Sequence, residues 1–314
     1  MLGERRGARA LLIGTGTHAP GSPLPGVPAV ERNLLDLRRV LRERCGLPDT
    51  AITTLLDPPT MAAIGDAVAD AVAASAERAP LLVYYAGHGL VSATGALYLA
   101  AAATDPGGTR LEHTALPFAT LRRYLLDSRA RPLVVVLDCC FSGRALTGLT
   151  VPEEDLAGLA EIEGGYVLTS AGRGQLALAP GGAEHTAFTG ELLRTLEEGI
   201  PDGPRRLTLA SLFRELSQRL PAGGFPSPHA RWSARAAELA LADNPGWPGE
   251  GSPREPDAEG QESVAAPPAG SPYRGLAAFG TEHEPLFFGR ERVTARLAQE
   301  CAACHDDQQP LLVM

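Results

Sequence analysis

Apolar runs and amphipathic segments alternate along most of the chain. Runs without a polar alternation predict buried strands at residues 8–14, 51–57, 80–89, 131–138 and 165–171. Apolar positions at helical spacing predict helices at residues 28–45, 60–78, 116–128, 186–198 and 207–220. A last apolar segment, residues 236–242, closes the series. Such an alternation indicates an α/β fold with a mostly parallel sheet that helices cover on both faces.

The composition changes after residue 242. Residues 243–272 are mainly Pro, Gly, Ser and acidic residues with almost nothing to bury, which is typical of a flexible linker. Order is expected again in residues 273–314, which contain a helical pattern and the start of an apolar strand. This segment is too short to enclose a core. We therefore expect an α/β domain at residues 1–242, a linker, and the front edge of a truncated second domain.

Composition and charge exclude several classes of protein. The chain is 44% hydrophobic and 21% charged, as in globular proteins. Its net charge is −9 and its 28 basic residues are scattered arginines, so we expect neither a nucleic-acid nor a membrane partner. No apolar run approaches the roughly 18 residues of a membrane span, and the N-terminus lacks a signal peptide. Five cysteines without an export signal predict thiols in a reducing cytoplasm.

Two of the predicted strands end in reactive side chains. The third ends in "YYAGHG", with His88 between Gly87 and Gly89, and the fourth runs into "LDCCFSG", with the pair Cys139 and Cys140. The carboxyl ends of parallel strands share one edge of the sheet, and neighbouring strands lie about 4.8 Å apart. A thiol and an imidazole brought together there can act as nucleophile and general base. The amides of Gly89 and Cys140 could donate to an oxyanion.

Each motif by itself has a structural explanation. A lone Gly-His-Gly is more often a loop, and paired cysteines at a strand end are more often core residues. The two motifs together are more specific, because each follows an apolar strand and His88 and Cys140 lie 52 positions apart. That separation is close to the roughly 50 residues known for caspases.

The two motifs resemble those of the caspase-like cysteine peptidase superfamily, and are closest to the bacterial metacaspase type, whose patterns are Y-S-G-H-G and D-x-C-x-S-G. The resemblance covers residues 8 to about 242 and includes "VLTSAGRGQLALA" and "HTAFTGELLRTLEEG". It implies a mostly parallel six-stranded sheet, with Cys140 as the nucleophile, His88 as the base, and a structural role for Cys139. The chain departs from the pattern at Ala86 and Phe141, neither of which removes a group that the chemistry needs.

The same resemblance implies a substrate. Metacaspase-type members place an acid two residues before the nucleophile, at the floor of the S1 pocket, and here that residue is Asp138. A carboxylate there would pair with Arg or Lys at P1; the alternative is that Asp138 only caps a loop amide. A second S1 acid is replaced by Asn33, with Asp36 close by. The expected function is a cysteine endopeptidase, and the alternative is a catalytically silent adaptor.

The resemblance requires no cofactor or metal for the peptidase. Some metacaspases bind calcium, and the acidic stretch 152–164 is the candidate here, but it lacks the alternating oxygen ligands of a loop site.

The last segment has a resemblance of its own. "YRGLAAFGTEHEPLFFGRERV" is similar to the opening of a STAND-type NTPase domain, in which Phe288, Gly289 and Arg290 would lie near the adenine. No Walker A loop occurs in these 314 residues, so ATP binding belongs to a longer protein only. The resemblance implies an NTPase and sensor region as a regulatory partner, oligomerisation through that region, and a bacterial signalling or defence pathway.

Overall fold

A computed structural model describes residues 1–92, 94–142, 165–170 and 183–249 of the chain. Contacts divide the chain into two units, Met1–Ser252 and Pro253–Met314. The described residues all belong to the first unit. Most of the expected linker, all of residues 273–314 and the acidic stretch 152–164 lie outside them. The described part contains no helix that is long and apolar enough to cross a membrane.

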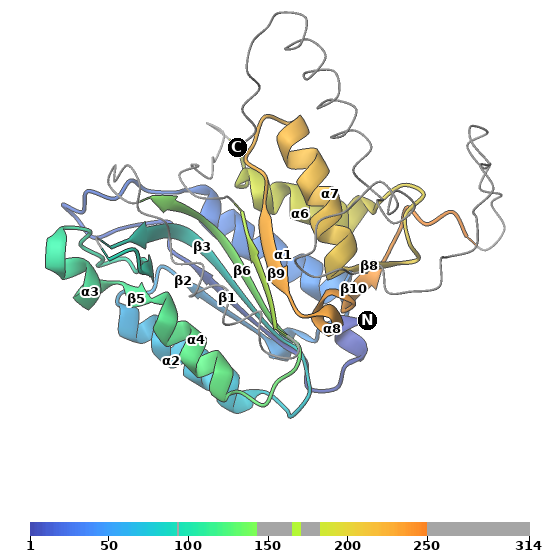
Figure 1. Cartoon of the computed structure of the whole chain (residues 1–314), viewed down its shortest axis with the longest axis horizontal. Coiled ribbons are helices and arrows are strands. Elements are labelled where there is room, and N and C mark those ends of the chain that lie inside the picture. Colours follow the sequence, from blue (N-terminus) through green and yellow to red (C-terminus); the bar gives the residue numbers. More distant parts are fainter. Residues whose placement is uncertain (93, 143–164, 171–182, 250–314) are drawn as a thin grey trace, which may run out of the picture. The chain divides into compact units, whose positions relative to one another are not determined.

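A twisted central sheet runs through the first unit (Figure 1). Its main path has the strand order β2-β1-β3-β6-β7-β9. The bounds of these strands are β1 Arg9–Gly14, β2 Ile52–Leu56, β3 Leu81–Val91, β6 Leu133–Ser142, β7 Gly165–Thr169 and β9 His229–Trp232. All neighbours on this path pair in parallel except β7 and β9, which are antiparallel.

In the described part of the chain, four short strands lie off this path. They are β4 Leu97–Leu99, β5 Leu116–Pro117, β8 Arg206–Thr208 and β10 Ala240–Asp243. β4 pairs with the end of β3 and β5 pairs with β4, whereas β8 and β10 form a separate two-stranded sheet. The pairing with β4 lengthens β3 beyond its apolar run.

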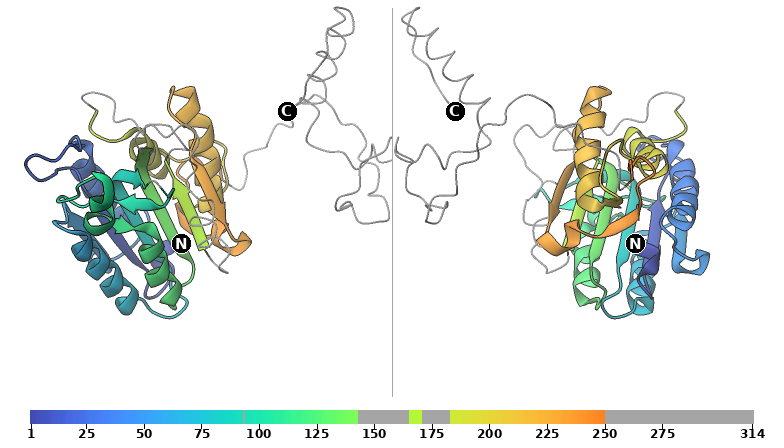
Figure 2. Two further views of the ribbon diagram at one scale, coloured as in Figure 1. Left: turned by 60° about the vertical axis from the view of Figure 1, so that its left-hand side comes forward. Right: turned by 90° about the vertical axis from the view of Figure 1, so that its right-hand side faces the viewer.

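Helices cover both faces of the sheet (Figure 2). One face carries α1 Ala29–Glu43, α6 Ala187–Glu198 and α7 Leu209–Ala222. The other carries α2 Met61–Ala74 and α4 Phe118–Asp127. The short helices α3 Leu111–Thr114 and α8 Ala234–Ala237 lie at its margins.

The alternation of side chains along each strand separates two cores. In β3, Leu82 and Tyr84 pack in the cluster of α1, α6 and α7, while Val83 and Tyr85 pack in the cluster of α2 and α4. This is the period of two that a strand imposes. The uninterrupted apolar runs follow from it, because every position of an inner strand faces one of the two cores.

The five predicted helices and the first five predicted strands are confirmed, with boundaries that shift by a few residues. The apolar segment at residues 236–242 does not add a strand to the main path, because Ala234–Ala237 is helical and, among the described residues, β10 pairs with β8. The sixth strand of the main path is instead β9. Its sequence, "HARW", is mostly exposed on an edge and therefore has no apolar run that could predict it.

We expect two adjacent leucines of α1 to differ sharply in their effect on stability. Leu34 is 1% exposed within the core and Leu35 is 54% exposed. Leu34→Ala should lower the free energy of unfolding by about 2–5 kcal/mol, because it removes buried methyl groups and leaves a cavity. Leu35→Ala should change it by less than about 0.5 kcal/mol. Urea denaturation of both variants measures this, and equal losses would contradict the placement of α1.

Candidate active site

The pairing of β3 with β6 places the two reactive motifs side by side. His88 lies opposite Cys140 in the register, and Ala86 lies opposite Asp138. Neighbouring strands are about 4.8 Å apart, so the backbones of His88 and Cys140 are direct neighbours. His88 lies inside β3, as the predicted strand at residues 80–89 implies. The sequence predicts Cys140 just beyond the strand at residues 131–138, but it lies inside β6, which continues to Ser142.

A carbonyl on the loop between β1 and α1 holds the ring of His88. Its Nε2 lies 2.7 Å from the carbonyl oxygen of Pro25. A carbonyl only accepts hydrogen bonds, so Nε2 carries the proton and Nδ1 keeps its lone pair when the ring is neutral. His88 can therefore act as a base through Nδ1. Sequence reasoning missed Pro25, because no local signal marks a carbonyl 63 positions before the histidine.

The loop that carries Pro25 is anchored by Asp57 at the end of β2. The Asp57 carboxylate accepts hydrogen bonds from the amides of Gly16 and Thr17, at 2.7 and 3.0 Å, and from the Thr17 hydroxyl at 2.5 Å. Burial disfavours the charged form of Asp57, but these hydrogen bonds outweigh it and hold its pKa below the ordinary value. The amide of Val27 donates to the Gly16 carbonyl and closes the loop at 2.8 Å.

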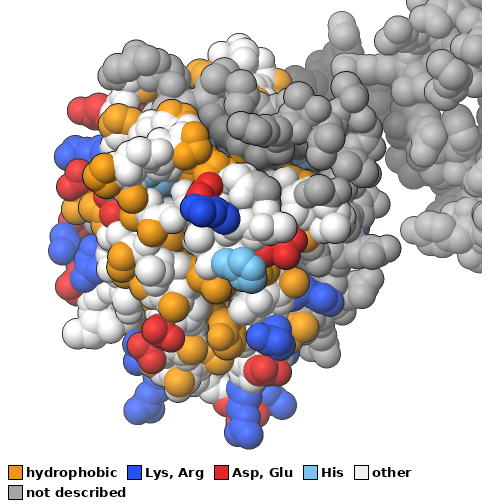
Figure 3. All heavy atoms as spheres, turned by 90° about the vertical axis from the view of Figure 1, so that its left-hand side faces the viewer, with side chains coloured by type: hydrophobic (Ala, Val, Ile, Leu, Met, Phe, Trp, Pro, Cys, Tyr) orange, Lys and Arg blue, Asp and Glu red, His pale blue; other side chains and the backbone are white. Residues whose placement is uncertain are grey.

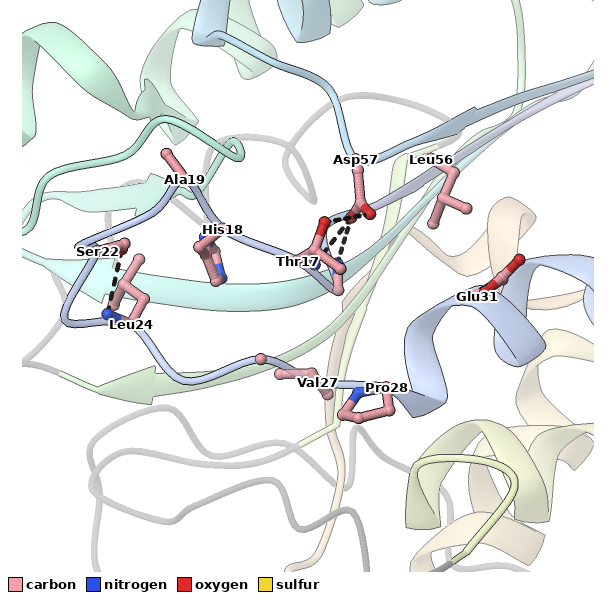
Figure 4. A pocket seen from close by; sticks show the side chains of 12 residues that line it. Thr17, His18, Ala19, Ser22, Leu24, Val27, Pro28, Glu31, Leu56 and Asp57 are labelled. Atoms are coloured by element: carbon pink, nitrogen blue, oxygen red, sulfur yellow. Dashed lines mark hydrogen bonds between the residues drawn. The ribbon is translucent and has the colours of Figure 1, made fainter.

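This loop frames a cavity of about 470 Å³ (Figure 4). Thr17, His18, Leu24, Glu31 and Asp57 are among the residues that line it. The cavity is bounded by the ends of β1 and β2, by the loop, and by the first turn of α1. In the sheet order, β3 lies between β1 and β6. The cavity is at the ends of β1 and β2, so it lies on the side of β3 that is opposite to β6.

A second histidine of the loop lies against His88. The ring centroids of His18 and His88 are 5.3 Å apart and the planes are inclined by 38°. Both ring nitrogens of His18 are buried, and neither has a hydrogen-bond partner among the described residues. Burial, and then the proximity of His88, lower the pKa of His18. Sequence reasoning did not single out this residue.

Glycine is required before His88. Gly87 has φ = +148°, and a Cβ there would lie 2.9 Å from the Tyr85 hydroxyl and 3.0 Å from the Thr15 carbonyl oxygen. Gly89 lies within β3, opposite Phe141 in β6 and Leu99 in β4. The oxyanion role predicted for the amides of Gly89 and Cys140 therefore requires that each amide be free of the sheet's own hydrogen bonds.

Asp138 is a buried residue of β6 and is 2% exposed. Its Oδ2 accepts from the hydroxyls of Thr186 and Thr189, the second at 2.6 Å, and from Tyr84 at 3.3 Å. Its Oδ1 has no hydrogen-bond partner among the described residues. Burial raises the pKa of Asp138 above its ordinary value, although the surrounding hydroxyls act in the opposite direction. None of these bonds caps a loop amide.

The two α1 residues considered beside Asp138 have different surroundings. Asn33 is buried and donates from Nδ2 to the Thr186 hydroxyl at 2.9 Å, so it belongs to the group around Asp138. Asp36 instead contacts His185, at 2.8 Å, and two arginines of its own helix. Burial opposes the charged form of Asp36, but His185 and Arg39 outweigh it and lower its pKa. Asp36 thus links α1 to the segment just before α6 through its contact with His185.

Other predicted residues are placed differently or not at all. Cys139 is 1% exposed and packs in the core of α2 and α4, as a structural cysteine would. Phe288, Gly289 and Arg290 lie outside the described residues. Within the described ranges no group of three His, Cys, Asp or Glu side chains could hold a metal ion. The face at the carboxyl ends of the strands shows scattered charges of both signs in its described part, rather than a basic patch (Figure 3).

The described part is an α/β fold with a mainly parallel sheet, in which His88 and Cys140 are paired on neighbouring strands. The family model described as "Caspase domain" matches residues 8–236, and the chain belongs to this family. Its members are usually cysteine peptidases. No curated protein matches the sequence.

Two solved structures are among those to which the chain is similar. Protein GSU0716 from Geobacter sulfurreducens is 21% identical, with a TM-score of 0.53, and the match covers 76% of this chain and 98% of that one. Caspase-1 from Spodoptera frugiperda is 14% identical, with a TM-score of 0.49, and the match covers 71% and 86% of the two chains. At 21% identity, the likeness to the first structure concerns the fold alone.

We expect His18 to make the fold sensitive to acid. The folded-state pKa of His18 lies below its ordinary value of about 6.5. The folded protein therefore binds a proton at His18 less readily than the unfolded chain, and stability falls as the pH drops below about 6.5. His18→Phe should flatten the loss of melting temperature between about pH 7 and pH 5.

His113 is the matched control for this measurement, because it is an exposed histidine. His113→Gln should leave the pH dependence of the melting temperature unchanged. An unaltered profile in His18→Phe would show that His18 titrates as it does in the unfolded chain.

Proposed function

We propose that this protein is a cysteine endopeptidase that cleaves after Arg or Lys. The observation that carries the proposal is the register of His88 beside Cys140, together with the Pro25 carbonyl that fixes the tautomer of His88. Membership of the caspase-domain family supports it. The strand that carries His88 is the direct neighbour of the strand that carries Cys140, which supports the assignment of base and nucleophile.

The reaction follows from these groups. His88 Nδ1 takes the proton of the Cys140 thiol, and the thiolate attacks the scissile carbonyl carbon. The tetrahedral oxyanion collapses as the imidazolium donates its proton to the leaving amine, which gives an acyl-enzyme and the first product. His88 then deprotonates a water molecule that attacks the thioester, and the cysteine leaves as the second product forms. Throughout, the bond from Nε2 to Pro25 keeps the ring oriented.

Asp138 supplies the specificity in this proposal. It lies two residues before Cys140 in β6, and it is a buried acid with one oxygen that no described residue satisfies. An isolated buried carboxylate is costly unless a cation or donor pairs with it. A P1 guanidinium or ammonium would be such a partner. In the free protein, burial raises the pKa of Asp138, because it disfavours the charged form. This is what we expect of an S1 acid that receives its cation from the substrate.

Two further parts of the proposal concern the whole protein. Residues 273–314, through their similarity to a STAND-type domain, would connect the peptidase to an NTPase that controls it in the cytoplasm. The second candidate function is an adaptor that uses the caspase fold only for interaction. The preserved pair His88 and Cys140 favours the enzyme. Labelling by an arginyl chloromethyl ketone that depends on Cys140 distinguishes the two functions.

We expect the activity to depend on one cysteine of the pair. Cys140→Ala and His88→Ala should each lower kcat/KM on a fluorogenic Arg peptide by at least about 1000-fold, because nucleophile and base act as a unit. Cys139→Ala is the matched control, since Cys139 is packed in the core. It should keep most of the activity. An active Cys140→Ala and an inactive Cys139→Ala, both folded by circular dichroism, would assign the nucleophile to Cys139.

We expect Asp138 to select a basic P1 residue. Asp138→Asn should weaken the binding of the transition state of P1-Arg peptides by about 2–4 kcal/mol, the scale for leaving a buried charge unpaired. The value of kcat/KM on these peptides should therefore fall by roughly 30- to 900-fold. Alkylation of Cys140 by iodoacetamide, which has no P1 side chain, should continue in the variant. Efficient cleavage after Asp by the wild type would refute the proposed specificity.

A further inference from the structure

We infer that Thr186 and Thr189, at the start of α6, are the positioning residues that set P1 specificity. They hold one oxygen of Asp138 and leave the other as the single acceptor for the substrate, so that Asp138 accepts Lys and Arg side chains almost equally. This inference rests on the proposed function and adds to it two residues and a mode of recognition.

The occupied oxygen of Asp138 is Oδ2. It accepts from the hydroxyl of Thr186, from that of Thr189 at 2.6 Å, and from Tyr84 at 3.3 Å. Tyr84 also lies 2.7 Å from the Thr189 hydroxyl. The Thr189 hydroxyl gives its one proton to Oδ2, so the single proton of the nearby Tyr84 hydroxyl is shared between Thr189 and Oδ2. The two threonine hydroxyls already match the two lone pairs of Oδ2, which leaves none for a donor from a ligand.

Asn33 fixes the orientation of the first threonine. Its Nδ2 donates to the Thr186 hydroxyl at 2.9 Å, and its Oδ1 accepts from the Thr186 amide at 3.2 Å. With Asn33 as the donor, the Thr186 hydroxyl is an acceptor on that side and directs its own proton to Asp138. Asn33, Thr186 and Thr189 are all buried, with exposed fractions of 0%, 7% and 0%. Such a satisfied, buried group holds the carboxylate in a single rotamer.

The remaining oxygen, Oδ1, lies outside this set of bonds. It is buried, and no described residue makes a hydrogen bond of normal geometry to it, although the Ser170 hydroxyl is close enough to help lower the pKa of Asp138. Such an oxygen costs free energy unless a donor arrives. Ser170, just after β7, donates its hydroxyl proton to the Cys139 carbonyl at 3.4 Å. With one oxygen available, the two-bond fork that normally favours Arg over Lys cannot form. An ammonium and a guanidinium nitrogen can each give one bond to Oδ1.

The surroundings of Asp138 also make recognition depend on pH. The groups that face it are Tyr84 from β3, Thr186 and Thr189 from α6, Ser170 after β7, and Asn33 of α1 behind Thr186. Only Tyr84 among them titrates, and its pKa is raised well above the ordinary range by burial and by Asp138. A substrate cation must therefore compete with protonation of Asp138 itself. Removing a hydroxyl donor shifts that competition toward the protonated acid.

The test uses the whole chain and three peptides that differ only at P1, with Arg, Lys or citrulline, the neutral analogue of Arg. In the wild type, the kcat/KM values for the Arg and Lys peptides should agree within about tenfold, because a single hydrogen bond to Oδ1 discriminates little between the two side chains. Both should exceed citrulline by at least about 30-fold. An Arg preference above about 100-fold would overturn single-oxygen recognition, and this result requires no variant.

The variants test the two threonines. Thr186→Val and Thr189→Val should each reduce the preference for Arg over citrulline at least about fivefold and move the acidic limb of kcat/KM for Arg to higher pH. Thr186→Ser and Thr189→Ser keep the hydroxyl and should retain the wild-type preference. Thr195→Val is the matched control, because Thr195 is equally buried in α6 but donates to the Glu191 carbonyl at 2.8 Å. It should leave the preference unchanged.

The failure of this inference is distinguishable from the failure of the proposed function. Cleavage of the Arg peptide by the wild type and not by Cys140→Ala establishes the peptidase. If the valine variants then keep the Arg-to-citrulline preference, or if Thr195→Val changes it equally, the threonines do not position Asp138. Iodoacetamide labelling of Cys140 at an unchanged rate in all variants shows that only P1 recognition has been altered.

Discussion

The parallel pairing of β3 with β6 is the interaction on which the candidate site depends. Ten consecutive residue pairs lie in register, from Leu81 and Leu133 to Leu90 and Ser142. A slip by one residue would move every side chain of a strand to the other face. Burial of both faces in two separate cores therefore fixes the register strongly. The same constraint sets His88 beside Cys140 and Asp138 beside Ala86, so core packing and the geometry of the site have one physical cause.

Two polar groups support the site from opposite directions. On the side of β1, Asp57 anchors the loop that presents the Pro25 carbonyl to His88. On the face of α1 and α6, Thr186 and Thr189 hold one oxygen of Asp138. Each group joins a charged or titratable residue to a different part of the chain. The histidine and the carboxylate can thus be oriented independently, one for chemistry and the other for specificity.

Both groups leave buried polar atoms without a partner in the described part of the chain. These atoms are the ring nitrogens of His18 and the Oδ1 of Asp138. A native fold retains few such atoms, because each costs free energy that packing has to offset. Their position, next to His88 and two residues before Cys140, is consistent with sites where a fold gives up stability for function.

The sequence by itself determined the layered α/β fold and the two motifs. Apolar runs and helical spacing are local signals, and a strand that is buried on both faces must be apolar at its buried positions, as residues 10–13 of β1 and the first half of β3 are. The motif around His88 and the motif around Cys140 each directly follow such a run, so their common edge could be predicted from connectivity alone.

Only the tertiary structure decided what surrounds these residues. The partners of His88 and Asp138 come from distant segments: Pro25 lies 63 positions from His88, and Asn33 lies 153 positions from Thr186. A threonine or a proline carbonyl has no pattern that marks it in advance, because its role depends on the element packed against it. The edge strand β9 was missed for a related reason, since pairing with β7, and not burial of its own side chains, makes it a strand.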